Sequence, residues 1–231
     1  MKNYSIKENA FYVLRAAYQS KNSDISNLVE DAEFDEQHPQ DLIQRCQQSL
    51  ISPVARLEQE LSWLPELSGD QIEKIKAKLQ SDREGELYKE IKFFPELPKA
   101  NVLAHLCLAG KISTVIVQDL LRAWEQVNEE DLLEFINDQR EIAGFPRANR
   151  AQLENVVKSL GTNHARNAAA AVWKAKDPGK VMEALVEEEV ERTPKSSILA
   201  RFVQEYDKLS EIHLSRISDE IDKQTEKALR R

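Results

Sequence analysis

Apolar residues recur at intervals of three and four along almost the whole chain, which is the period of helices that bury one face. Convincing alternation at a period of two, the sign of a half-buried strand, is missing. The predicted fold class is therefore all-α. The expected helices cover about 10–17, 24–36, 40–50, 53–65, 69–79, 86–94, 100–109, 115–127, 131–143, 148–160, 164–176, 181–191 and 197–229.

Proline and glycine set most of these boundaries, because proline starts a helix well and glycine ends one. Gly144 and Gly161 are both expected to end a helix. No long linker divides the chain, and the best candidate boundary is 65–69. We therefore expect a helical module over 1–65 and a multi-helix bundle over 66–231.

The last expected helix is the longest, and its apolar positions follow one stripe. Leu199, Phe202, Tyr206 and Leu209 are expected to be mostly buried. The helix either packs on the bundle or pairs with another chain, so a homo-oligomer through it is one expectation. The larger aromatic side chains are expected in the core or between helices. These are Trp63, Phe93, Phe94, Trp124, Phe145 and Trp173.

Charge and composition narrow the class of protein. Lys and Arg total 32 against 40 Asp and Glu, and the formal net charge is −8 in 231 residues. This balance argues against a general nucleic-acid binder, which needs cations to neutralise phosphates. The chain has no apolar N-terminal segment and no run of the ~20 apolar residues that span a membrane. With two cysteines far apart, the pattern favours reduced thiols and a cytoplasmic protein.

Residues suited to catalysis or metal binding do not form a recognisable motif. His105 and Cys107 are two positions apart, so on a helix they point to different faces. No metal or cofactor is expected, and His105 and His213 are interpreted as partly buried helix residues. Nucleophile-elbow and phosphate-loop motifs are missing as well. A carboxylate-based enzyme stays open only because Asp and Glu are abundant.

The first 65 residues contain an ordered set of features. Asn9 to Leu14 reads Asn-Ala-Phe-Tyr-Val-Leu, His38-Pro39-Gln40 separates two helices, and Leu50 to Arg56 fits Leu-x-x-Pro-x-x-Arg. Over about residues 6–65 this order resembles the J-domain family, the co-chaperones of Hsp70 ATPases. The resemblance implies an antiparallel helical hairpin with the His-Pro loop at its tip. The implied core consists of Phe11, Val13, Leu14, Ile25, Leu28, Val29, Ala32, Ile43, Cys46, Leu50 and Leu57.

The resemblance also implies a partner-binding loop made of His38, Pro39, Gln40 and Asp41. The sequence departs from the family there, because Gln40 stands where the family has Asp and a carboxylate follows only at Asp41. The helix over 24–36 departs too, since the family's basic helix is here rich in carboxylates. Like charges across an interface disfavour association. The module is therefore interpreted as a J-like scaffold without standard ATPase stimulation.

The leading hypothesis is a non-enzymatic helical adaptor that belongs to a larger complex and binds a protein partner. One alternative is a co-chaperone that docks an Hsp70-family ATPase through His38-Pro39-Gln40, which requires a basic docking face on that partner. A further alternative is a subunit of a bacterial secretion or defence machine.

Overall fold

The computed structural model describes residues 4–81, 83–110, 113–190 and 197–229, and every regular element in these ranges is a helix. The all-α class is thus confirmed. Short 3-10 turns lie at Ile6–Glu8, Glu84–Glu86 and Ile91–Phe93. The α-helices are α1 (Ala10–Val13), α2 (Asn22–Phe34), α3 (Gln40–Ile51), α4 (Pro53–Leu61), α5 (Gly69–Gln80), α6 (Leu87–Glu90), α7 (Glu96–Leu108), α8 (Thr114–Glu125), α9 (Glu129–Ala143), α10 (Arg150–Trp173), α11 (Pro178–Val190) and α12 (Ser197–Leu229).

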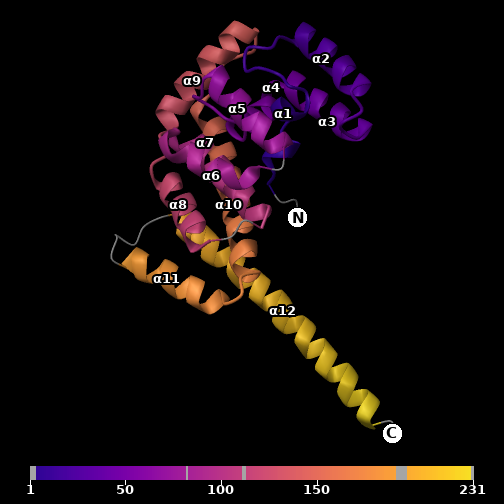
Figure 1. The fold of residues 1–231 in the computed structure, drawn as a ribbon, viewed down its shortest axis with the longest axis vertical. Helices are drawn as coiled ribbons and strands as arrows, with labels where there is room; N and C mark the ends of the chain where they lie inside the picture. Colours follow the sequence, from indigo (N-terminus) through magenta and orange to yellow (C-terminus); the bar gives the residue numbers. More distant parts are fainter. Residues whose placement is uncertain (1–3, 82, 111–112, 191–196, 230–231) are drawn as a thin grey trace.

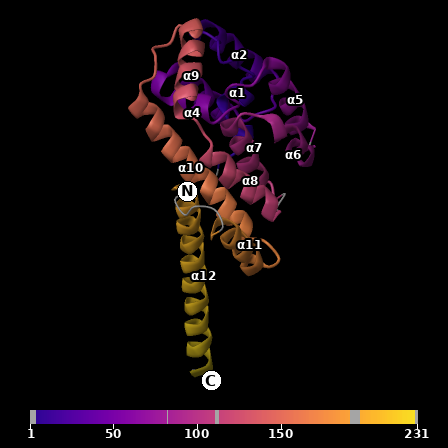
Figure 2. The ribbon, with the colours of Figure 1, turned by 90° about the vertical axis from the view of Figure 1, so that its left-hand side faces the viewer.

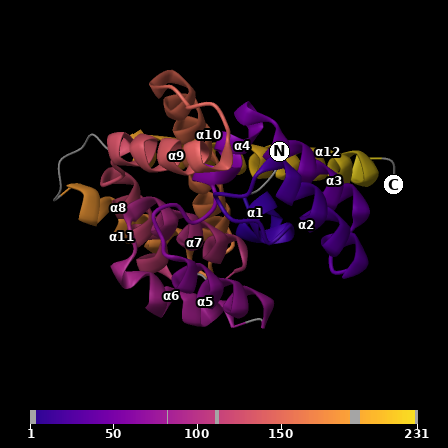
Figure 3. The same cartoon turned by 90° about the horizontal axis from the view of Figure 1, so that it is seen from above.

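The N-terminal helices form a hairpin with its base against the body of the molecule. Helix α2 packs on α3, and α1 and α4 contact the base of α3. Pro39 is the N-cap residue of α3, and Ser52 caps α4 by accepting the Ala55 N–H. Of the predicted core residues in this region, all are buried except Leu28 and Ala32, which are partly buried against the core. Figures 1 and 3 show α2 and α3 at an edge of the helical body.

Helix α10 runs unbroken through Gly161, so the predicted helix end at this glycine is wrong. The reason is close packing. A Cβ at Gly161 would lie 2.6 Å from Arg201 Nη1, 3.6 Å from Trp124 and 3.7 Å from Ile198. Glycine lets α8 and α12 approach α10 at this point. Gly144, in contrast, has a left-handed φ of 76° and ends α9 as predicted.

A single hydrophobic core continues across position 65. Helix α4 packs on α10, and polar side chains of α7 and α10 form hydrogen bonds with the first 65 residues. The buried Asn101 on α7 donates to the carbonyls of Leu61 and Trp63 at 2.9 and 2.6 Å. Asn167 on α10 donates to the carbonyl of Tyr4 at 2.7 Å. The N-terminal hairpin is therefore anchored by hydrogen bonds as well as by apolar packing.

Helix α12 packs on α10 along its first part, where Phe202 is fully buried. Leu199, Tyr206 and Leu209 are partly buried there. The next stretch, 211–221, is exposed throughout.

Figures 1 and 2 show the rest of α12 as a helix projecting from the body. The interpretation of His213 as partly buried is wrong, because His213 lies at the end of the contact and is exposed beside Trp173. Phe93 also departs from expectation, being 85% exposed. Within the described ranges, no helix has the length and apolarity that crossing a bilayer requires.

Candidate functional site

The loop between α2 and α3, together with the first turn of α3, carries the residues that the sequence singled out. Arg15, which follows α1, contacts the segment between α2 and α3. The Arg15 guanidinium contacts Asp35 Oδ2 at 2.8 Å and donates to Gln37 Oε1 at 3.2 Å. Glu36 adopts a left-handed φ of 51°, which turns the chain out of α2. These contacts link Arg15 to the end of α2 and to the loop at the hairpin tip.

The four predicted site residues lie together at this tip. His38 is half-buried, with its ring edge-on to Tyr12 at 6.2 Å between centroids. Burial and the nearby Arg15 cation lower the pKa of His38, so the imidazole is neutral at pH 7. Pro39, Gln40 and Asp41 are exposed. The Asp41 carboxylate lies 3.2 Å from Arg45, one turn along α3.

The outer face of α2 is acidic and carries one large apolar side chain. Ile25 and Val29 point into the core, while Phe34 is 88% exposed at the last turn of the helix. The sequence of Asn22–Phe34 contains no Lys or Arg. Exposed carboxylates on the helix and the following turn belong to Asp24, Glu30, Asp31, Glu33, Asp35 and Glu36. We call Asp24, Glu30, Asp31, Glu33 and Phe34 the α2 face.

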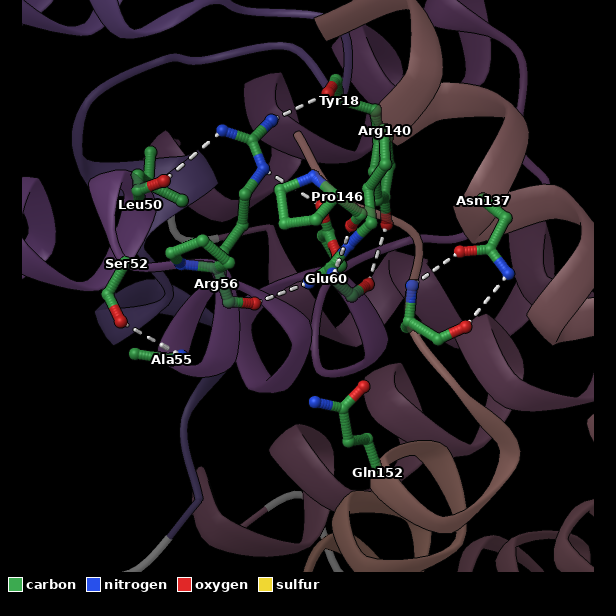
Figure 4. A network of polar contacts seen from close by, with 12 residues as sticks. Tyr18, Leu50, Ser52, Ala55, Arg56, Glu60, Asn137, Arg140, Pro146 and Gln152 are labelled. Atoms are coloured by element: carbon green, nitrogen blue, oxygen red, sulfur yellow. Dashed lines mark hydrogen bonds and ion pairs between the residues drawn. The ribbon is translucent and has the colours of Figure 1, made fainter. Parts of the chain in front are cut away.

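A buried ionic network, which the sequence did not predict, lies behind the hairpin (Figure 4). Arg56 Nε donates to Glu60 Oε1 at 2.8 Å, and Arg140 Nε donates to Glu60 Oε2 at 2.7 Å. All three side chains are almost completely excluded from solvent. Glu60 on α4 is therefore bound directly to α9, eighty positions away in sequence.

The remaining guanidinium donors of this network form hydrogen bonds with backbone carbonyls of neighbouring segments. Arg56 donates to the carbonyls of Tyr18 and Leu50, and Arg140 donates to the carbonyls of Pro53 and Pro146. Burial raises the pKa of Glu60 and lowers that of Arg56, while the opposite charges within the network limit both shifts. Both Glu60 carboxylate oxygens accept hydrogen bonds from arginines. We therefore interpret the network as a structural link that positions α4 against α9. The sequence held one signal for this network. Arg56 and Glu60 are four positions apart on α4, next to the buried Leu57 and Leu61.

Two buried histidines and the buried Cys107 lie outside the loop between α2 and α3. His164 Nδ1 accepts the Trp124 indole N–H at 3.0 Å, and burial lowers the pKa of His164 to about 3. His105 lies 3.6 Å from Glu84, and burial lowers the pKa of that imidazole. Burial raises the pKa of Cys107 to about 12, so it stays a thiol. Over the described ranges, no three His, Cys, Asp or Glu side chains group as metal ligands.

Comparison with protein-family models, with curated proteins and with solved structures finds no match to this chain.

Proposed function

We propose that the chain is a non-enzymatic adaptor that docks a basic protein surface through the α2 face. The observation that carries this proposal is the nearly fully exposed Phe34 on a helix with only acidic charged side chains. Opposite potentials speed the encounter of two proteins and select between partners. An aromatic side chain surrounded by charges supplies the apolar anchor that such interfaces use.

The contacts that anchor the hairpin support the same proposal. The Arg15 contacts hold the loop after α2, and the Arg56–Glu60–Arg140 network holds the helices behind it. A preformed face loses less conformational entropy when it binds than a mobile one does. The adaptor would therefore present the α2 face ready for its partner.

The co-chaperone alternative uses the neighbouring loop. It is supported by the hairpin arrangement and by the exposure of Pro39, Gln40 and Asp41 at its tip. The carboxylates of the α2 face require that an Hsp70-family partner have a basic docking surface. An adaptor within a bacterial secretion or defence machine would use the α2 face in the same way, with a different partner.

The test is affinity capture from the native host with variants that change one surface at a time. The α2 face is altered by E30K/E33K and, separately, by Phe34→Ala. The matched control is E134K/D138K, which makes the same change in charge on exposed positions of α9. The loop is altered by H38Q/D41A.

We expect one partner with a basic surface to be lost with both α2 variants and retained with the α9 control. Loss of an Hsp70-like ATPase with H38Q/D41A alone favours the co-chaperone alternative. Equal capture by every variant contradicts docking through either surface.

A second contact surface is favoured by the projecting part of α12. Leu214 and Ile217 are 62% and 43% exposed and lie three positions apart on one face, with the exposed Ile221 four positions further. Pairing of α12 with α12 of a second copy would bury this stripe, as in a coiled coil. We therefore propose a homodimer through α12 in addition to the α2 interaction.

A further inference from the structure

A cleft with both polar and apolar lining lies between α4, α10 and the N-terminal segment. Its volume is about 420 Å³. One wall is a row of short polar side chains on α10, namely Asn155, Ser159 and Asn163. These residues are four apart, so they follow one face of the helix. Helix α4 contributes Glu58 and Gln59 to the opposite wall.

The floor of the cleft is fixed by hydrogen bonds. Asn9 Nδ2 donates to the Gln59 carbonyl at 2.9 Å and to Ser62 Oγ at 3.0 Å. The Tyr4 hydroxyl donates to the Ser62 carbonyl at 2.7 Å, and Gln59 Oε1 accepts the Ala10 N–H at 2.9 Å. The cleft is thus a preformed concavity.

The α10 wall keeps its hydrogen-bonding capacity. The Asn163 Oδ1 accepts from Arg166 at 2.9 Å, which leaves the amide NH₂ of Asn163 to donate. The side chains of Asn155 and Ser159 form no hydrogen bond with the described part of the chain. A carboxamide offers a donor and an acceptor side by side, like one peptide unit. The side chains of this row can therefore form hydrogen bonds with a polypeptide backbone.

The spacing of the row fits an extended chain. Four residues of α-helix rise about 6 Å. Two residues of extended chain rise about 6.6 Å, so alternate residues of a strand meet successive members of the row. We propose that this cleft binds an extended segment of about four residues through its main chain, with a basic side chain beside Glu58.

Other ligand classes fit the cleft less well. Nucleotides and other phosphates need free cations, but the Arg166 guanidinium is bound to Glu205 at 2.9 Å, and Glu8 and Glu58 add negative charge. A stacked base or a sugar needs an exposed aromatic face, but Tyr4 is only 9% exposed. A lipid chain needs a wholly apolar lining, whereas Asn155, Ser159 and Asn163 give this cleft a polar wall.

The test uses the full chain and fluorescein-labelled decapeptides of Ala, Gly and Ser with blocked ends. One peptide carries a central Lys, one a central Glu, and one the Lys with an N-methylated backbone. We expect the Lys peptide to bind and the N-methylated peptide to bind at least ten-fold more weakly. N155A/N163A should weaken binding at least ten-fold, and Glu58→Lys should reverse the preference toward the Glu peptide.

The control is Lys158→Ala, an exposed position of α10 outside the cleft, which should leave binding unchanged. Circular dichroism of each variant checks that the helices are retained. The proposal is overturned if no peptide binds up to millimolar concentration, or if N155A/N163A binds as well as the unchanged protein. Because the α2 face is unaltered in these variants, this outcome is independent of partner capture.

Discussion

Replacing Glu60 with Gln tests the energetic role of the buried ionic network. The substitution preserves the size of the side chain but leaves the Arg56 and Arg140 cations without a counter-ion. It also removes one of two charge-assisted hydrogen bonds, at 2.8 and 2.7 Å, because the Gln NH₂ cannot accept from a guanidinium. Breaking a buried ion pair in this way costs about 3–5 kcal/mol. That cost is a large fraction of the free energy of unfolding of an ordinary domain, about 5–15 kcal/mol.

Urea unfolding followed by tryptophan fluorescence measures this loss, since Trp63 is buried close to α4. The control is Glu58→Gln, a neighbouring exposed carboxylate, which should change the free energy of unfolding by less than about 0.5 kcal/mol. E60Q/R140Q should cost less than the sum of the two single changes, because the second removes a cation that the first leaves unpaired. A loss below about 1 kcal/mol for E60Q would refute the assignment of the network as a main link between α4 and α9.

Three further outcomes are expected. The pKa of about 3 for His164 lies below its ordinary value, so its contribution to stability is complete above about pH 6.5 and declines as the pH falls. Denaturant titrations should show the unchanged protein losing up to about 1.4 kcal/mol per pH unit more than H164Q between pH 6 and 4, and parallel curves would contradict this. Gly161→Val should cost at least about 1–3 kcal/mol by overpacking, with a smaller effect for Gly161→Ala because the flexible end of Arg201 can move, and equal thermal midpoints would argue against a tight crossing. L214S/I217S should convert a dimer to a monomer in light scattering, and an unchanged protein that is already monomeric at high concentration disproves pairing through α12.

Much of the fold could be predicted from local signals. Pro39 and Pro53 restrict the backbone at the starts of α3 and α4, and Gly144 ends α9 in a conformation that glycine tolerates. Gly161 could not be distinguished from such a terminator by sequence alone. Its role depends on Arg201, Trp124 and Ile198, which belong to other helices.

The extent of burial along α12 was similarly beyond a sequence argument. The predicted stripe continues from Leu199 to Ile221, but burial stops near Trp173 because α10 ends there and offers no further surface. That His38 to Asp41 lie together was easier to predict, since they are consecutive, but their role as a site stays a prediction. The contact of Glu60 with Arg140 was harder to predict, because Arg140 lies far along the chain and no local pattern connects the two residues.

The central claim is that Phe34 lies in a protein interface, and photo-cross-linking tests it most directly. A benzophenone amino acid replaces Phe34 in the native host, and an identical substitution at Phe93, which is 85% exposed on another surface, is the control. We predict one discrete adduct from position 34, with the cross-linked partner peptide rich in Lys and Arg, and no such adduct from position 93. The same adducts from both positions, or none from position 34, would contradict docking through the α2 face.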